Sequence, residues 1–229
     1  MIQEVPRAEW LKARLALLEK EKALTRMRDE LAAARRALPR VRIEKDYVFD
    51  TPSGRRKFVG LFDGKSQLII YHFMLAPGAA NPCPSCSFWS EQYDALRVHL
   101  PHRDVNLICV SRAPLAEIEA VRARMGWRFP WASSHGSDFN QDFGVTFTEA
   151  QAGQALYNFN TQAARAGESP GVSVFARDGE AVFHTYSAYA RGLDALNGVY
   201  QLLDLTPKGR DEAGLAWPMA WLKLKDQYG

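Results

Sequence analysis

Two cysteines separated by two residues form the motif with the clearest chemical meaning, Cys83-Pro84-Ser85-Cys86. A thiol pair at this spacing either cycles between a dithiol and a disulfide or supplies half of a tetrahedral zinc site. Zinc needs four ligands, and the sequence contains neither a second Cys-x-x-Cys nor a His-x-x-x-His motif. The pattern therefore favours redox chemistry, and we expect neither a metal nor a cofactor.

The position of the pair predicts different roles for its two thiols. Pro84 suits the first position of a helix, which would place Cys83 beside backbone N–H groups that lack partners. These groups and the helix dipole stabilise a thiolate, whose pKa would otherwise be about 8.5. Cys83 is thus the expected nucleophile and Cys86, one turn further along, the resolving thiol. Cys109 lies between apolar residues and is predicted to be buried and inert.

Other residues are candidate supporting groups. Trp89 lies on the apolar face of the helix that follows the pair, where its spacing favours a core role over a substrate platform. His72 is in a strand that adjoins the pair, and it could either tune a thiolate or play a structural role. Tyr186 and Arg191 follow the last hairpin and are candidate substrate contacts, and Ser85 lies within the motif itself.

The elements that would position these groups alternate between strands and helices. Periodicity and turn residues predict a hairpin over 47–62, a buried strand over 67–74, a helix from the cysteine pair to residue 100, a strand over 105–110, a helix between Pro114 and Gly126, strands over 172–177 and 181–187, and a helix over 193–203. Residues 127–168 are predicted to be irregular. Two strand–helix steps of crossover length imply parallel strands, and Asp178-Gly179 predicts an antiparallel hairpin.

A long helix is predicted over residues 7–38. Its large apolar residues recur every seven positions, a coiled-coil pattern, at Trp10, Leu17, Leu24, Leu31 and Leu38. Such a helix could join two copies of the chain or lie across its own domain, and the pattern leaves both interpretations open. We expect three parts: an N-terminal helical arm (1–40), a central domain (41–205) and a C-terminal tail packed on that domain (206–229).

Composition argues against several classes of function. The 229 residues are 47% hydrophobic and 24% charged, as in ordinary globular proteins. The formal net charge is +3, and residues 1–40 hold ten Lys/Arg and six Asp/Glu, which leaves −1 for the remainder and indicates no nucleic-acid surface. No apolar run approaches the roughly 18 residues of a membrane helix. The first ten residues lack a secretory pattern, so a cytoplasmic location is expected.

The order of the predicted elements, with the cysteine pair between the first core strand and helix, resembles the thioredoxin fold. That resemblance implies an α/β protein with a mixed central sheet flanked by helices, a long N-terminal helix and an insertion before the penultimate core strand. The thioredoxin fold carries a cis-proline just before that strand, and Ser169-Pro170 occupies the corresponding position. The Cys-Pro-Ser-Cys motif is closer to the glutaredoxin pattern than to that of thioredoxin.

More specific motifs resemble a bacterial thioredoxin-like family of unknown function, related to the alkyl hydroperoxide reductase/thiol-specific antioxidant branch. The stretches that carry this resemblance are Asp46-Tyr47-Val48-Phe49, Cys83-Pro84-Ser85-Cys86-Ser87-Phe88-Trp89, Val110-Ser111-Arg112-Ala113-Pro114-Leu115, Ser137-Asp138-Phe139-Asn140 and Phe183-His184-Thr185-Tyr186.

These resemblances imply a thiol–disulfide oxidoreductase that acts on a protein or small-molecule disulfide and depends on a cellular reductant. Peroxiredoxins place a threonine three residues before the peroxidatic cysteine, whereas Ala80 stands there relative to Cys83. Disulfide exchange is therefore favoured over peroxide reduction, which is kept as an alternative. A redox-silent module that dimerises through its N-terminal helix is the other alternative.

Overall fold

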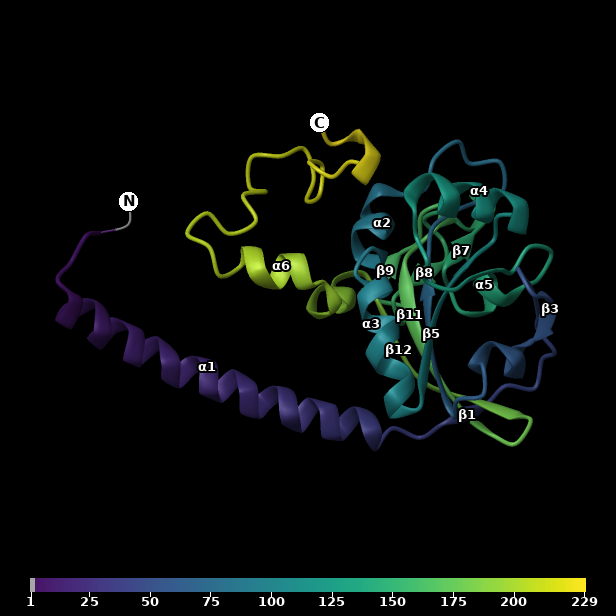
Figure 1. The fold of residues 1–229 in the computed structure, drawn as a ribbon, viewed down its shortest axis with the longest axis horizontal. Coiled ribbons are helices and arrows are strands. Elements are labelled where there is room, and N and C mark those ends of the chain that lie inside the picture. Colours follow the sequence, from purple (N-terminus) through teal and green to yellow (C-terminus); the bar gives the residue numbers. More distant parts are fainter. Residues whose placement is uncertain (1–2) are drawn as a thin grey trace. The chain divides into compact units, whose positions relative to one another are not determined.

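The computed structural model describes residues 3–229, and the chain divides into two compact units, residues 1–39 and residues 40–229. The first unit consists mainly of the helix α1 (Arg7–Arg36), which confirms the long helix predicted from the heptad pattern (Figure 1). None of the residues of α1 is buried. Its heptad residues Trp10, Leu17, Leu24 and Leu31 are 44% to 50% exposed.

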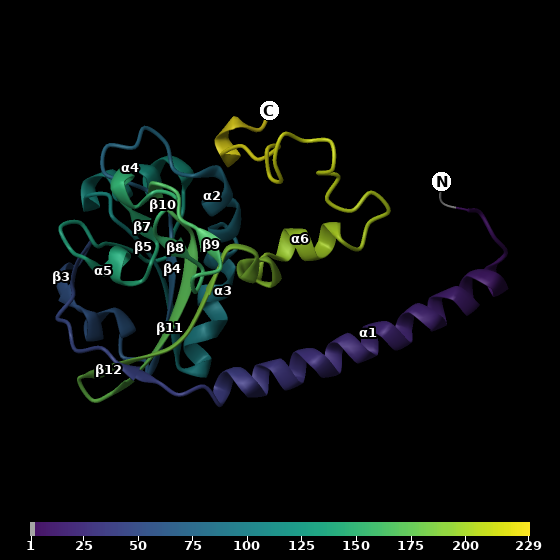
Figure 2. The same cartoon turned by 180° about the vertical axis from the view of Figure 1, so that it is seen from behind.

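The second unit is built around a mixed sheet of eight strands, in the order β1-β12-β11-β4-β5-β6-β2-β3 (Figure 2). Its four central strands are β4 (Gln67–His72), β5 (Val105–Ser111), β11 (Gly171–Asp178) and β12 (Ala181–Tyr189). Strands β4 and β5 are parallel, β11 is antiparallel to β4, and β12 is antiparallel to β11. This order and these directions make the body a thioredoxin-like α/β fold, as the order of elements predicted.

Shorter strands extend the sheet at both edges. Beyond β5 lie β6 (Trp131–Ser133), which is parallel to β5, and the hairpin of β2 (Val48–Thr51) and β3 (Gly54–Lys57). At the other edge, β1 (Val41–Arg42) pairs with β12. The insertion before β11 also forms two small ladders, made by β7 (Thr146–Phe147) with β10 (Gly167–Glu168) and by β8 (Leu156–Tyr157) with β9 (Gln162–Ala163).

The sheet separates two apolar cores. Strand residues alternate between its faces, so Ile69 and Tyr71 of β4 pack on one side and Leu68 and Ile70 on the other. The first side is covered by α2 (Pro84–Ser90), α3 (Tyr93–His99), α4 (Leu115–Met125) and α6 (Gly198–Leu203). The second is covered by α5 (Phe139–Asp142) and a 3₁₀ helix (Phe58–Phe62). The cysteine pair belongs to the first side.

Four predicted elements differ in the structure. The helix expected over 193–203 is divided into a 3₁₀ helix (Ala190–Leu196) and α6. The helix expected from the cysteine pair to residue 100 is divided into α2 and α3, and Gln92 at the break hydrogen-bonds to Leu196 and Gly198 beyond β12. Residues 58–62, expected in a strand, form the 3₁₀ helix because Phe58, Leu61 and Phe62 are buried together at helical spacing. The region 127–168, expected to be irregular, contributes β6 to the main sheet, since three buried residues are too few to produce an alternating pattern.

Candidate functional site

The loop after β4 brings the cysteine pair to the end of the central sheet. Cys83 is the N-cap residue of α2, and Pro84 is its first residue. The backbone amide and the hydroxyl of Ser87 each donate to the Cys83 carbonyl at 2.9 Å, which closes the first turn of the helix. The amide of Met74, just beyond β4, donates to the Sγ atom of Cys86 at 3.4 Å. Helix and strand therefore hold the inner thiol between them.

Cys83 and Cys86 are free thiols that hydrogen-bond to each other. The hydrogen bond from Cys86 is the main cause that lowers the pKa of Cys83 to about 7; the N–H groups of Cys86 and Ser85 and the Ser85 hydroxyl add to it, and burial opposes them. Burial and the neighbouring Cys83 raise the pKa of Cys86 well above its ordinary value. The pair is thus polarised, with an ionisable outer thiol and a protonated inner one.

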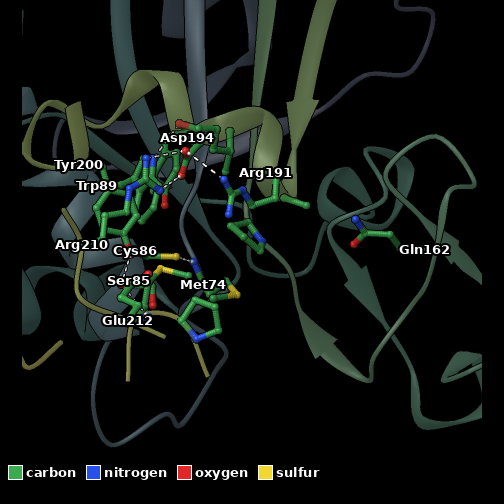
Figure 3. A pocket seen from close by; sticks show the side chains of 16 residues that line it. Met74, Ser85, Cys86, Trp89, Gln162, Arg191, Asp194, Tyr200, Arg210 and Glu212 are labelled. Atoms are coloured by element: carbon green, nitrogen blue, oxygen red, sulfur yellow. Dashed lines mark hydrogen bonds and ion pairs between the residues drawn. The ribbon is translucent and has the colours of Figure 1, made fainter. Parts of the chain in front are cut away.

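A cavity of about 340 Å³ lies beside the pair (Figure 3). Cys86 lines it, whereas Cys83 does not. The apolar lining consists of Tyr71, Met74, Trp89, Pro170, Ala190, Leu193, Pro218 and Met219. The polar lining consists of Ser85, Gln162, Arg191, Asp194, Tyr200, Arg210 and Glu212. Trp89 serves both the core and the cavity, because it is 6% exposed and its indole N–H donates to the Leu193 carbonyl at 3.1 Å.

The charged groups of the cavity wall are largely paired with one another. Arg210 donates to both carboxylate oxygens of Asp194, at 2.9 Å each, and also to Asp204, at 2.8 and 2.6 Å. Bidentate guanidinium–carboxylate pairs of this kind are strong and directional. The side chain of Arg191 is 82% exposed and reaches Asp194 at 3.4 Å.

Glu212 accepts a second group of hydrogen bonds in the polar wall. Its Oε1 atom accepts three hydrogen bonds, from the Tyr200 hydroxyl at 2.7 Å, the Trp221 indole at 2.7 Å and the Met219 amide at 3.0 Å. These hydrogen bonds outweigh partial burial and lower the pKa of the Glu212 carboxyl. The carboxylate is therefore an ionised structural acceptor.

Pro170 lines the cavity, but the peptide bond that precedes it is trans. This chain therefore differs from the thioredoxin fold, which carries a cis-proline at the corresponding position. The loop is joined to the insertion by two hydrogen bonds: the Ser169 amide donates to the Val145 carbonyl at 2.8 Å, and the Tyr157 hydroxyl donates to the Pro170 carbonyl. Ser169 itself does not line the cavity.

His72 lies on the opposite face of the sheet from the thiols, since it follows Tyr71, whose side chain hydrogen-bonds to Cys86. Its Nε2 atom is 2.8 Å from the Ser173 hydroxyl, which in turn lies 2.8 Å from the Ser187 hydroxyl. Burial lowers the pKa of His72 to about 3, so the ring is neutral. The structure therefore separates His72 from the cysteine pair. Tyr186 packs against the same core as Cys86 but does not line the cavity.

Several residues that line the cavity have no local signal in the sequence. Arg210 and Asp194 are 16 positions apart, and Glu212 meets Trp221 only because the C-terminal segment folds back. Tyr200 was visible only as a member of an apolar helical stripe. Cys109 is fully buried, and burial raises its pKa well above the ordinary thiol value.

Within residues 3–229, no three His, Cys, Asp or Glu side chains converge as they would around a metal ion. None of the helices described there combines the length and the apolar character needed to cross a membrane.

Several solved structures of peroxiredoxins are loosely similar to the chain. A PrxQ mutant from Xylella fastidiosa is 12% identical with a TM-score of 0.44, and the match covers 68% of this chain and 89% of that one. Peroxiredoxin Q from Xanthomonas campestris is 15% identical with a TM-score of 0.45, over 68% and 89%. Peroxidoxin BcpB from Mycobacterium tuberculosis is 11% identical with a TM-score of 0.47, over 72% and 97%. TM-scores this low do not define a fold by themselves. The assignment of the fold therefore rests on the strand order described above.

Sequence relationships are more specific. No curated protein matches the chain. The family described as "Bacterial protein of unknown function (DUF899)" matches residues 2–228. The chain therefore belongs to this bacterial family of unknown function, as the motifs around Tyr47, Cys83, Ser111, Phe139 and Tyr186 predicted.

Proposed function

We propose that this protein is a thiol–disulfide oxidoreductase in which Cys83 attacks and Cys86 resolves. The observation that carries the proposal is the placement of the two thiols: Cys83 is the N-cap residue of α2, and Cys86 is buried one turn further along. The opposite directions of their pKa shifts agree with these positions. With a pKa of about 7, roughly half of the Cys83 thiols are ionised at neutral pH, whereas Cys86 keeps its proton. The adjoining cavity supplies space for a substrate beside Cys86.

The reaction in the reducing direction has two steps. The Cys83 thiolate attacks one sulfur of a disulfide R–S–S–R′; the substrate S–S bond breaks, and R′–S⁻ leaves as a mixed disulfide forms between Cys83 and R. Cys86 then passes its proton to the departing thiolate and attacks the Sγ atom of Cys83, which releases R–S⁻ and leaves a Cys83–Cys86 disulfide. The substrate gains two electrons and the protein loses two. An external dithiol restores the pair by the reverse exchange.

The surroundings of Cys86 support the second step. The Tyr71 hydroxyl and the Met74 amide both hydrogen-bond to Cys86 and favour its thiolate. The interaction with Cys83 raises the pKa of Cys86 in the resting pair. Once Cys83 is bonded to the substrate it carries no charge, and it no longer raises the pKa of Cys86. Formation of the mixed disulfide therefore activates the resolving thiol.

The test compares wild type with Cys83→Ser, Cys86→Ser and the matched control Cys109→Ala, using dithiothreitol as electron donor and bis(2-hydroxyethyl) disulfide as substrate. Wild type and the control should accelerate reduction, and Cys83→Ser should not. Cys86→Ser should accumulate a mixed disulfide at Cys83, detected by mass spectrometry. Equal rates for wild type and Cys83→Ser would sink the proposal and favour the redox-silent alternative. Oxidation of Cys83 by hydrogen peroxide much faster than free cysteine would instead favour a peroxidase.

A further inference from the structure

The cavity beside the cysteine pair has a wall made by the chain's own C-terminal segment, residues 206–229. Four residues of this segment line the cavity: Arg210, Glu212, Pro218 and Met219. Across from them lie Ser85, Cys86 and Trp89 of α2. In Figure 3 the Arg210 guanidinium lies next to Asp194, while Gln162 stands apart on another loop. The segment therefore covers the pair on the side of Cys86, the thiol that lines the cavity.

The first part of the segment is anchored by charge. Arg210 is tied to Asp194 and Asp204 by four hydrogen bonds, and its guanidinium stacks over the Tyr200 ring at 4.0 Å. Glu212 accepts three hydrogen bonds on one oxygen, including one from Trp221. This part of the cavity wall is thus braced against the segment that follows β12.

The end of the segment is anchored by packing. The Trp221 ring meets the Phe88 ring of α2 edge-on, with centroids 5.6 Å apart, and Leu224 is 1% exposed. Arg124 of α4 pairs with Asp226 at 2.7 Å and donates to Asn81, two residues before Cys83, at 2.7 Å. One side chain therefore joins the end of the C-terminal segment to the loop that delivers the nucleophile.

This covering limits the size of the substrate. A volume of about 340 Å³ is at the lower end of the range for small-molecule sites. A disulfide in a folded protein joins two Cα atoms about 5.5 Å apart, and four stretches of chain leave it. Those four stretches need more space than a cavity of this volume offers beside Cys86, whereas a low-molecular-weight disulfide fits.

The lining also indicates the charge of the substrate. Two arginines, Arg191 and Arg210, and two carboxylates, Asp194 and Glu212, give the lining no net charge. Arg210 and both carboxylates already hydrogen-bond within the wall. A dianionic or dicationic substrate would lose its hydration without gaining unpaired counter-charges, which is unfavourable. Most of the other lining side chains are apolar.

We infer that the C-terminal segment is a specificity element that restricts the cysteine pair to small, uncharged, largely apolar disulfides and excludes disulfides of folded proteins. The inference rests on the proposed exchange chemistry. It assigns the selectivity to contacts of residues 206–229 rather than to the cysteines themselves.

The experiment compares four substrates with the full chain, after subtraction of the Cys83→Ser background: bis(2-hydroxyethyl) disulfide, its dianionic analogue 3,3′-dithiodipropionate, the dication cystamine, and insulin. Wild type should prefer the neutral disulfide to each of the other three by roughly tenfold or more in kcat/KM. Insulin reduced within a few-fold of the neutral disulfide would overturn the size argument, and equal rates for the three small disulfides would overturn the charge argument. No Cys83-dependent reduction of any substrate would refute the proposed function instead.

Variants at Trp221 test the role of the segment directly. Trp221→Ala removes both the Phe88 contact and one hydrogen bond to Glu212, so insulin reduction should rise several-fold relative to the neutral disulfide. Trp221→Phe keeps the ring contact and should stay closer to wild type. An unchanged ratio in folded Trp221→Ala would overturn the assignment to this segment. If that variant does not fold, Arg124→Ala removes the ion pair with Asp226 at the end of the same segment. The ratio of insulin reduction to reduction of the neutral disulfide in that variant then tests the assignment in the same way.

Discussion

Replacement of Cys86 by alanine is expected to raise the pKa of Cys83 and slow its alkylation. The lowering of the Cys83 pKa from 9.0 to about 7 favours the thiolate by roughly 2–3 kcal/mol, since one pH unit corresponds to about 1.4 kcal/mol. The hydrogen bond from Cys86 is the largest cause. If its loss returns the pKa to 8, the thiolate fraction at pH 7 falls from about one half to about one tenth, and a full return to 9.0 leaves about one hundredth. Alkylation at pH 7 should therefore slow by about five- to fiftyfold.

The assay measures the rate of iodoacetamide alkylation at Cys83 from pH 5 to pH 10, with the modified peptide identified by mass spectrometry. The thiolate reacts, so the wild-type rate should rise with pH through a midpoint near 7 and level off above it. The control Cys86→Ser retains a hydroxyl donor and should shift the midpoint less than Cys86→Ala. A wild-type midpoint near 9, or the same midpoint in Cys86→Ala, would refute the reasoning.

Three further perturbations have expected outcomes. Burial holds His72 neutral with a pKa of about 3, so below pH 6.5 the unfolded chain binds one more proton than the folded chain. The free energy of unfolding should therefore fall by about 1.4 kcal/mol per pH unit as the pH is lowered from 6.5 towards 3. Urea unfolding at several pH values should show a weaker dependence of this free energy on pH for His72→Gln. Glu168, whose side chain is 8% exposed, pairs with Arg112 at 2.7 Å, so Glu168→Gln should lower urea stability by about 1–3 kcal/mol, and no loss would contradict a structural pair. We propose that α1 joins two copies of the chain through its exposed heptad residues, so the full-length protein should sediment as a dimer. The double substitution Leu17→Glu with Leu24→Glu should raise the dimer dissociation constant at least roughly a hundredfold. A wild-type protein that stays monomeric at all concentrations would contradict this proposal.

The central elements could be predicted because their signals are local. A strand whose alternate residues Ile69 and Tyr71 face one core and Leu68 and Ile70 the other needs no distant information. The Asp178-Gly179 turn predicted the β11–β12 hairpin for the same reason. The predictions failed where distant partners decide the conformation. Gln92 breaks the helix after the cysteine pair through contacts with Leu196 and Gly198, more than a hundred residues away.

Which face of a strand adjoins the cysteine pair also depended on tertiary structure. His72 adjoins Tyr71 in sequence and was a candidate for tuning a thiolate, yet the pleat places the two side chains on opposite faces of the sheet. Pro170 occupies the position expected from the fold, but contacts with Val145 and Tyr157 in the insertion accompany a trans bond there. Neither outcome is encoded in the neighbouring residues.

The long helix α1, the family and the place of Cys83 and Cys86 at the start of a helix follow from the amino-acid sequence, because spacing, periodicity and turn chemistry act between near neighbours. The surroundings of the pair follow from contacts between distant segments. The cavity wall depends on Arg210 meeting Asp194 and on Trp221 packing against Phe88, and no periodic pattern links these residues. Such contacts depend on the compact packing of the whole body, since each gains free energy only when the groups that face it are already in place.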